Sequence, residues 1–230
     1  MKRVLTIAVL TAAVCVAFAG VTFAAGTQDG SVVALHAKAH ALKNYCLAPN
    51  APLIACSQFT KTWPVGSSSD VYLIVAKAQQ APGVAGVSCG IMYNPAIGGG
   101  VDVYQTYLCA DLEFTNAGAY GEWPRAGGGN RITWVSTTNC QRTLYGTEGV
   151  QAVAEAFYVY AYSPDMFSVT PNNNLVSGPE LAVADCAAST TYLPLTGFGG
   201  AIGFGQPGYN PCTDMVPVEP ATWGKIKSQF

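Results

Sequence analysis

Short apolar runs with a period of two recur along this chain, separated by Gly, Pro and Asn. In residues 83–94, every second side chain from Val87 to Tyr93 is apolar, which gives an extended segment one apolar face. Further runs that favour strands are found at residues 31–42, 70–78, 101–109, 131–135, 150–162, 166–170, 180–185 and 201–205. About nine short strands with turn residues between them predict a single all-β sandwich domain.

Two of these runs are rich in alanine, which also permits a helix. In residues 31–42 the period of two favours a half-buried strand, and residues 150–162 end in the strongly β-prone sequence FYVYAY. Residues 221–230 are the late helix candidate, one or two turns long, with Trp223 as an anchor. We therefore expect at most one or two short helices.

The N-terminus has the three parts of a secretory signal. Lys2 and Arg3 precede an uncharged apolar run, and small residues precede a cleavage point after Ala24. The alternative is a membrane anchor, which needs roughly 20 consecutive apolar residues, and Gly20 interrupts the run. Residues 1–24 are thus predicted to be a cleaved signal peptide, and residues 25–230 a single disulfide-linked domain without a membrane span. The expected location is extracellular or at the cell surface, with the periplasm as the alternative.

The charge of the chain limits its partners. Charged residues make up 10% of the sequence, the formal net charge is −2, and no basic cluster is present. Nucleic-acid binding depends on Lys and Arg side chains that neutralise phosphates, so that this function is excluded. A surface with so little charge is typical of proteins that pack against neighbours.

Seven cysteines follow the predicted signal, and the odd number leaves one unpaired. Cys89 lies on the apolar face of its run and is expected to be a free, buried thiol. The other six allow 15 pairings, of which we predict the sequential one. A zinc site is the alternative, but no CxxC pair is present. The predicted disulfides are Cys46–Cys56, Cys109–Cys140 and Cys186–Cys212.

Several short blocks resemble a group of uncharacterised secreted bacterial proteins. These blocks are residues 83–94, 121–134, 139–143, 180–186 and 221–227. The arrangement also resembles cohesins and related carbohydrate-binding sandwiches, in which a β-run enters a turn as Tyr93-Asn94-Pro95 does here. The resemblance implies a jelly-roll-like or cohesin-like sandwich of about nine strands. The chain departs from cohesins in its many cysteines and long Gly-rich insertions, so that a dockerin-binding role does not follow.

Residues capable of catalysis are few. His36 and His40 are the only histidines, and on a strand they would lie about 13 Å apart, too far for one metal ion. They are expected on a solvated polar edge. No GxSxG motif is present, and an apolar strand would make Cys89 inert as a nucleophile. Asp111 and Glu113 could serve a secreted hydrolase, but neighbours on one strand rarely oppose each other across a substrate. No cofactor or metal is expected.

Aromatic residues could form a surface for stacking sugars. Tyr158, Tyr160 and Tyr162 share one face of their predicted strand. Trp63, Trp123 and Trp134 could add further rings to this surface, and Trp63-Pro64 and Trp123-Pro124 are expected in loops, where a flat ring can be exposed. The alternative is that these tryptophans close the ends of the core.

The sequence favours a secreted or cell-surface module without catalytic activity, with a role in adhesion, matrix or envelope structure. Its expected partner is a protein or polysaccharide surface, or a second copy of the chain. Carbohydrate binding through exposed Trp and Tyr is the first alternative, and hydrolysis by Asp111 or Glu113 is the second.

Overall fold

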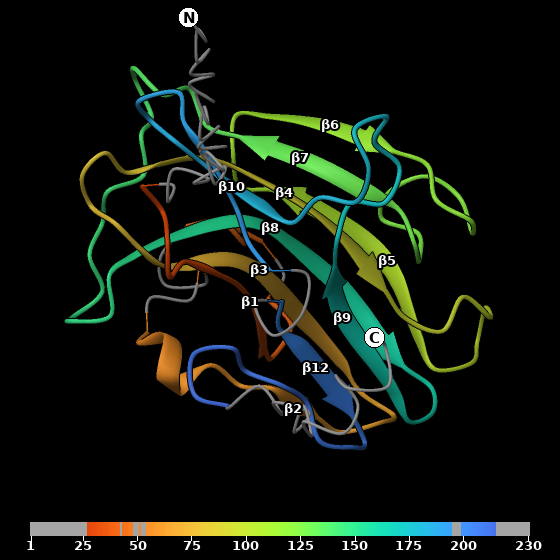
Figure 1. Ribbon diagram of the computed structural model, residues 1–230. Coiled ribbons are helices and arrows are strands. Elements are labelled where there is room, and N and C mark those ends of the chain that lie inside the picture. Colours follow the sequence, from red (N-terminus) through yellow and green to blue (C-terminus); the bar gives the residue numbers. More distant parts are fainter. Residues whose placement is uncertain (1–26, 42, 48–50, 52–53, 195–198, 215–230) are drawn as a thin grey trace, which may run out of the picture.

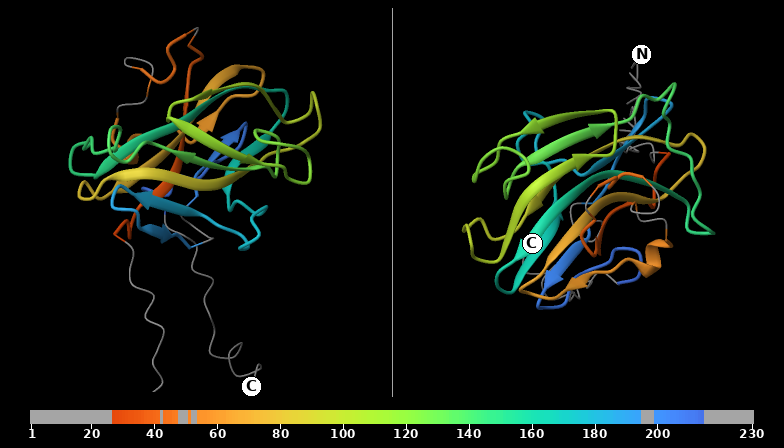
Figure 2. Two further views of the ribbon diagram at one scale, coloured as in Figure 1. Left: turned by 90° about the horizontal axis from the view of Figure 1, so that it is seen from above. Right: turned by 180° about the vertical axis from the view of Figure 1, so that it is seen from behind.

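The computed structural model describes residues 27–41, 43–47, 51, 54–194 and 199–214. The predicted signal peptide and the helix candidate at residues 221–230 lie outside the described residues. The described chain is a two-layer sandwich of β-strands, shown in Figure 1 and from two further directions in Figure 2. The described part contains no helix that is long and apolar enough to cross a membrane.

The first layer, sheet A, contains four antiparallel strands in the order β1-β3-β8-β5. Their bounds are Val32–Lys38 for β1, Ser68–Ala78 for β3, Val150–Ala161 for β8 and Val101–Leu108 for β5. The long strands β3 and β8 lie at the centre, where both faces are covered, and both are nearly continuous apolar runs. The strand predictions for the two alanine-rich runs are therefore confirmed.

The second layer, sheet B, contains eight strands, with β11-β10-β4-β9-β12-β2 along one path. Strand β7 pairs with the other side of β4, and β6 pairs with β7. The bounds are Thr62–Trp63 for β2, Val84–Met92 for β4, Leu112–Asn116 for β6, Gly129–Thr133 for β7, Asp165–Thr170 for β9, Ala182–Asp185 for β10, Thr190–Tyr192 for β11 and Ala201–Phe204 for β12.

The all-β prediction is confirmed, with twelve strands in the described part instead of about nine. Strands β2, β6 and β11 were not expected from the sequence. Strands β2 and β11 are only two and three residues long, and the five-residue β6 has only two apolar side chains, Leu112 and Phe114, both of which are exposed. One 3-10 turn, Cys56–Gln58, is also present.

The space between the sheets is filled by the interior cluster, which contains the apolar inner faces of both sheets. In β4, the side chains of Val87, Cys89, Ile91 and Tyr93 are all buried there. Cys89 is fully buried and unpaired, as predicted. Burial raises the pKa of its thiol far above the ordinary value, and the nearby Glu155 carboxyl adds to the effect.

A second apolar layer, the outer cluster, covers part of the opposite face of sheet A. Here Tyr72 and Ile74 of β3 pack against Tyr45, Cys56 and Phe59 from irregular segments. Sheet A is thus covered on both faces where the outer cluster lies, which explains why the sequence of β3 is almost continuously apolar.

The predicted disulfide pairing is wrong for all three bonds. Instead of Cys46–Cys56, Cys109–Cys140 and Cys186–Cys212, the structure pairs Cys46 with Cys109, Cys56 with Cys212, and Cys140 with Cys186. Only Cys140 and Cys186 are neighbours in the order of cysteines along the chain, and each bond forms where two segments distant in sequence cross.

The Cys140–Cys186 pair illustrates how a strand brings two cysteines together. The amide of Val84, at the start of β4, donates to the carbonyl of Gln141, and the amide of Cys186 donates to the carbonyl of Gly83. Both flanking segments therefore meet at one point of the sheet. A Cβ atom at Gly83 would lie 2.6 Å from the Cys140 Sγ, so that this close approach requires glycine.

Candidate functional site

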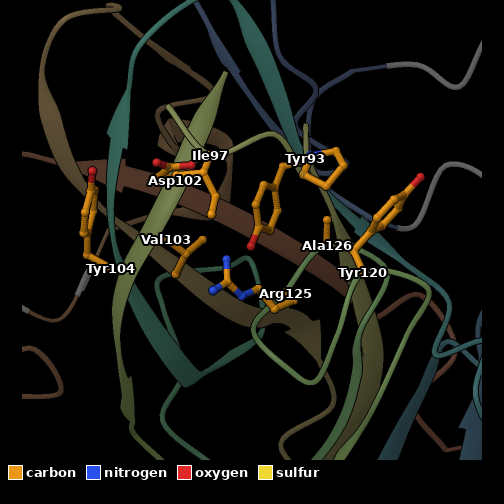
Figure 3. Close-up of a pocket in the computed structure, with 9 residues that line it drawn as sticks. Tyr93, Ile97, Asp102, Val103, Tyr104, Tyr120, Arg125 and Ala126 are labelled. Carbon is orange, nitrogen blue, oxygen red and sulfur yellow. The ribbon is translucent and has the colours of Figure 1, made fainter. Parts of the chain in front are cut away.

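A pocket of about 240 Å³ opens where three separate segments meet. Its walls come from the start of β5, from the β4–β5 connection and from the loop before β7 (Figure 3). The lining residues are Tyr93, Pro95, Ile97, Asp102, Val103, Tyr104, Tyr120, Arg125 and Ala126.

Tyr93 fixes one wall of the pocket. Its ring stacks on the ring of Phe167 in the interior cluster, with 5.4 Å between the centroids. Its hydroxyl donates a hydrogen bond of 2.9 Å to the carbonyl of Pro124, which ties the loop before β7 to β4. Burial raises the pKa of Tyr93, and the Arg125 guanidinium opposes that rise. The phenol therefore remains neutral and serves as a fixed support.

Two aspartates hold the β4–β5 connection in shape. One Asp165 oxygen accepts hydrogen bonds of 3.0 Å from the amides of Asn94 and Val101, and an Asp102 oxygen accepts one of 3.0 Å from the amide of Gly98. Gly100 has a φ of +74°, and a Cβ there would lie 2.6 Å from the Asp165 carboxylate. The β4–β5 connection is thus preorganised, which lowers the entropy cost of binding a ligand.

The polar groups of the pocket are placed for contact with a ligand. Arg125 is exposed and forms no ion pair within the described part of the chain. In Figure 3 its guanidinium extends toward Tyr93 and Val103, while Tyr104 and Tyr120 stand at opposite sides of the pocket. Each of these two tyrosines is 54% exposed. The pocket therefore offers one unpaired cation between two exposed phenol rings.

The pocket continues into a row of four tyrosines, here called the tyrosine row: Tyr104, Tyr158, Tyr160 and Tyr162. The hydroxyls of Tyr104 and Tyr162 form a hydrogen bond, and the Tyr160 and Tyr162 ring centroids are 4.7 Å apart. The Tyr104 and Tyr158 centroids are 5.9 Å apart. The hydrogen bond to Tyr162 is the main cause that raises the pKa of Tyr104 to about 12, so that the Tyr104 phenol is uncharged at neutral pH.

A hydrogen bond between His40 and the buried Asp70 supports the far end of the tyrosine row. The ring of His40 lies over Tyr158, with centroids 4.1 Å apart, and its Nδ1 lies 2.9 Å from a carboxylate oxygen of Asp70. The amide of Ala41 donates to the other Asp70 oxygen at 2.6 Å. Burial raises the pKa of Asp70, and these hydrogen bonds oppose the rise. His40 and Asp70 thus fix the position of Tyr158.

The predicted tryptophan platform is not formed. Trp123 and Trp134 are buried in the interior cluster, and Trp63 is only partly exposed. The Nε1 of Trp123 donates to both carboxylate oxygens of Glu155, at 3.1 and 3.0 Å. The prediction of exposed stacking rings at Trp123 and Trp134 is therefore wrong, because both indoles close the core.

The predicted tyrosines do lie together, although only Tyr162 is largely exposed and Tyr158 and Tyr160 are half-buried. The sequence reasoning did not identify Asp102, Tyr104 or Arg125. The first two could have been found from the alternation in residues 101–109, which places Val101 and Val103 on the opposite face. Nothing in the local sequence marks Arg125.

The carboxylates considered for hydrolysis have structural partners. Asp111 accepts a hydrogen bond of 2.6 Å from the amide of Val135 and two from the Asn139 side chain. Glu113 accepts one of 2.8 Å from the Asn130 side chain. These bonds connect β6 to its neighbouring segments, and a catalytic role for the two carboxylates gains no support.

His36 does not lie on a solvated edge, so that expectation is wrong. Its side chain is buried, and the amide of Thr60 donates to its Nδ1 at 2.8 Å. Burial, with a smaller contribution from Lys38, lowers its pKa to about 4. The described residues contain no group of three His, Cys, Asp or Glu side chains that could hold a metal ion.

A scan against protein-family models found no match, and a search of curated proteins also found none. Among solved structures, the fold is similar to the cohesin module from a Clostridium perfringens ATCC13124 family 33 glycoside hydrolase. That match has 10% sequence identity and a TM-score of 0.40, and covers 76% of this chain and 97% of the other. A type II cohesin domain from the cellulosome of Acetivibrio cellulolyticus matches with 11% identity and a TM-score of 0.39, covering 62% and 90%.

The class of fold, an all-β sandwich, is defined by this chain's own strand pairing.

Proposed function

We propose that this protein is a non-catalytic binding module that acts outside the cytoplasm and holds a partner protein at the pocket and the tyrosine row. The observation that carries the proposal is the unpaired Arg125 guanidinium between two exposed tyrosines in a pocket held in shape by internal hydrogen bonds.

The location outside the cytoplasm is supported by the cysteines. Six of the seven cysteines after residue 24 are joined in three disulfides. Disulfides persist in oxidising compartments and are rare in the cytosol. The predicted secretory signal at residues 1–24 agrees with this location.

A protein partner is favoured by the residue types on this surface. Tyr and Arg are enriched at the energetically important centres of protein interfaces, because each combines a large contact area with directed hydrogen bonds. Tyr and Arg are both present on this surface, and its β4–β5 connection is held in shape by Asp102 and Asp165. An adhesion, matrix or envelope role is consistent with such a surface.

A polysaccharide is the second candidate ligand. The exposed ring of Tyr162 contacts Tyr160 and Tyr104, and flat phenol rings with hydroxyls can stack on sugars. Because Trp123 and Trp134 are buried, this candidate depends on the tyrosines alone.

The proposal is tested with the immobilised chain of residues 25–230. Wild-type protein is expected to retain a partner from envelope or secreted fractions of its source cells. Arg125→Glu and Tyr104→Ala are each expected to weaken retention at least about tenfold, since interface centres of this type cost more than about 1.4 kcal/mol when removed. Tyr192→Ala, which removes an exposed tyrosine from β11, is the matched control and should retain the partner.

A glycan array probed with the same four proteins and with Tyr162→Ala separates the two ligand classes. If wild type binds a glycan, Tyr104→Ala and Tyr162→Ala do not, and no protein partner is found, the ligand of this site is a polysaccharide. A partner that binds wild type and Arg125→Glu equally would refute the proposed site.

A further inference from the structure

Strand β6, Leu112–Asn116, forms an open edge of sheet B. It pairs with β7 over five residues, and no other strand of the described chain pairs with it. It is the outermost strand of its layer in Figure 1, and the same edge is seen from behind in Figure 2. In an antiparallel pair every second residue directs its N–H and C=O away from the partner strand. These backbone groups of β6 are therefore available for another strand.

This edge lacks most of the devices that usually prevent strands from associating: of these, only its short length and the charge of Glu113 are present. Protected edges carry Lys or Pro, contain a bulge, or lie under a covering segment. The sequence of β6 is LEFTN, and its pairing with β7 runs without a register shift. Four of its five residues are exposed, so that nothing in the described chain covers them. Its one charged side chain, Glu113, bonds to Asn130 of the neighbouring strand.

The same strand exposes two large apolar side chains. Leu112 is 54% exposed and Phe114 is 58% exposed. Because they are two residues apart, they lie on the same face of the strand, beside Thr133 and Arg131 of β7. An edge with free backbone groups and an adjacent apolar face is suited to antiparallel strand addition.

We propose that β6 pairs with β6 of a second copy of this chain, in an antiparallel dimer whose two-fold axis passes beside Phe114. In this register Phe114 faces its own symmetry mate, Glu113 faces Thr115 of the partner, and Leu112 faces Asn116 of the partner. Aromatic pairs stabilise such contacts across strands, and no like charges meet. The symmetry makes the contact isologous and closes it at two copies.

The charges of the strand exclude the nearby registers. A two-fold axis at Glu113 would place two carboxylates opposite each other, and an axis at Leu112 would place Glu113 opposite Asp111 twice. Like charges directly opposite are destabilising. An axis at Thr115 would separate the two Phe114 rings and extend the pairing beyond the end of β6. Residues 25–230, which lack Lys2 and Arg3, have a formal net charge of −4, with nine Lys and Arg against 13 Asp and Glu, and this adds little general repulsion between copies.

Analytical ultracentrifugation of residues 25–230 over a concentration series tests the dimer. Wild type is expected to pass from monomer to dimer as concentration rises. Phe114→Lys places two cations at the axis and should weaken dimerisation at least about 100-fold, and Phe114→Thr, which keeps a high strand propensity, at least about tenfold. Tyr192→Lys, at an exposed aromatic residue of edge strand β11, should leave the dimer unchanged. Far-UV circular dichroism confirms that each variant is folded.

Cysteine cross-linking tests the register. Under mild oxidation, Phe114→Cys should give a covalent dimer, whereas Leu112→Cys should not, because its mate is Asn116. A wild-type chain that stays monomeric at its highest soluble concentration overturns the proposal. A dimer that persists in both Phe114 variants also overturns it, and cross-linking by Leu112→Cys in place of Phe114→Cys overturns the register. Pairing of β6 with a strand of a different protein would appear as a monomeric wild type.

Discussion

The two apolar clusters of this protein are held together in different ways. The interior cluster lies between two hydrogen-bonded sheets and contains an unpaired cysteine, Cys89. The outer cluster lies between sheet A and irregular segments, and Cys56 and Cys212 link those segments covalently. Where two sheets face each other, the buried area and the strand pairing suffice. Where irregular chain covers a sheet, few backbone hydrogen bonds restrain it, and a covalent link replaces them.

Beside each cluster lies a buried side chain whose pKa is strongly shifted by burial. Glu155 bonds to Trp123 of the interior cluster, and burial raises its pKa from 4.5 to about 8 against the effect of the indole hydrogen bond. His36 lies beside Phe59 of the outer cluster, and burial lowers its pKa from 6.5 to about 4. Both groups are neutral in the folded protein at neutral pH, and they make stability depend on pH with opposite signs.

The largest effect is expected for Glu155→Gln. Since the folded carboxyl has the higher pKa, the folded state binds the extra proton between pH 4.5 and about 8. The free energy of unfolding should therefore be highest at low pH and fall by on the order of 3–4 kcal/mol as the pH rises through that range. Glutamine still accepts a hydrogen bond from Trp123 and has no proton to lose, so that this dependence should disappear.

Urea unfolding at about pH 5 and about pH 8 measures the difference. Glu122→Gln, at an exposed carboxylate that is not among the groups acting on Glu155, is the control and should keep the wild-type pH dependence. An equal decrease in wild type and Glu155→Gln would show that Glu155 is not the group responsible.

The second effect is expected when Cys56 and Cys212 are both replaced by alanine. This bond joins residues 156 positions apart, and its loss should lower the free energy of unfolding by about 3 kcal/mol. Hydrogen exchange should become faster at the amide of Thr60, which bonds to His36, before it becomes faster in β8.

Cys89→Ala provides the matched control for this experiment, because Cys89 is unpaired. It should leave exchange in the outer cluster unchanged. If hydrogen exchange became faster to the same degree in both clusters when Cys56 and Cys212 are replaced, the disulfide would not act specifically on the outer cluster.

The smallest effect is expected for His36→Asn. The unfolded histidine binds a proton at pH 6.5, whereas the folded one binds it only near pH 4. Stability of the wild type should therefore be fully present above about pH 6.5 and fall by about 2 kcal/mol by about pH 5. Asparagine should remove this loss, and its side-chain oxygen can still accept from the Thr60 amide. Urea unfolding between these pH values measures the loss of stability. His40→Asn, which replaces the other histidine, is the control. A loss of stability that persists in His36→Asn would contradict the prediction.

Much of the fold could be predicted from the sequence. The period of two in β4 placed Cys89 in the interior, and the aromatic end of residues 150–162 favoured the strand that became β8. The edge strand β6 was not found in this way, because its alternation contains only two apolar side chains, Leu112 and Phe114, which are too few to establish a period of two.

Less of the candidate site could be predicted. The shared face of Tyr158, Tyr160 and Tyr162 follows from strand geometry alone. That Tyr104 joins them depends on the pairing of β5 with β8, and that Arg125 lies in the same pocket depends on a loop that Tyr93 ties to β4.

The sequence by itself determined the elements that local alternation controls: strands, their buried faces and one free thiol. Tertiary structure decided the disulfide pairing, the burial of Trp123 and His36, and the location of the pocket. The physical reason is that alternation is a property of consecutive residues, whereas pairing and burial depend on which distant segments cross. Those crossings are set by the order of strands in two sheets, which no short stretch of the chain contains.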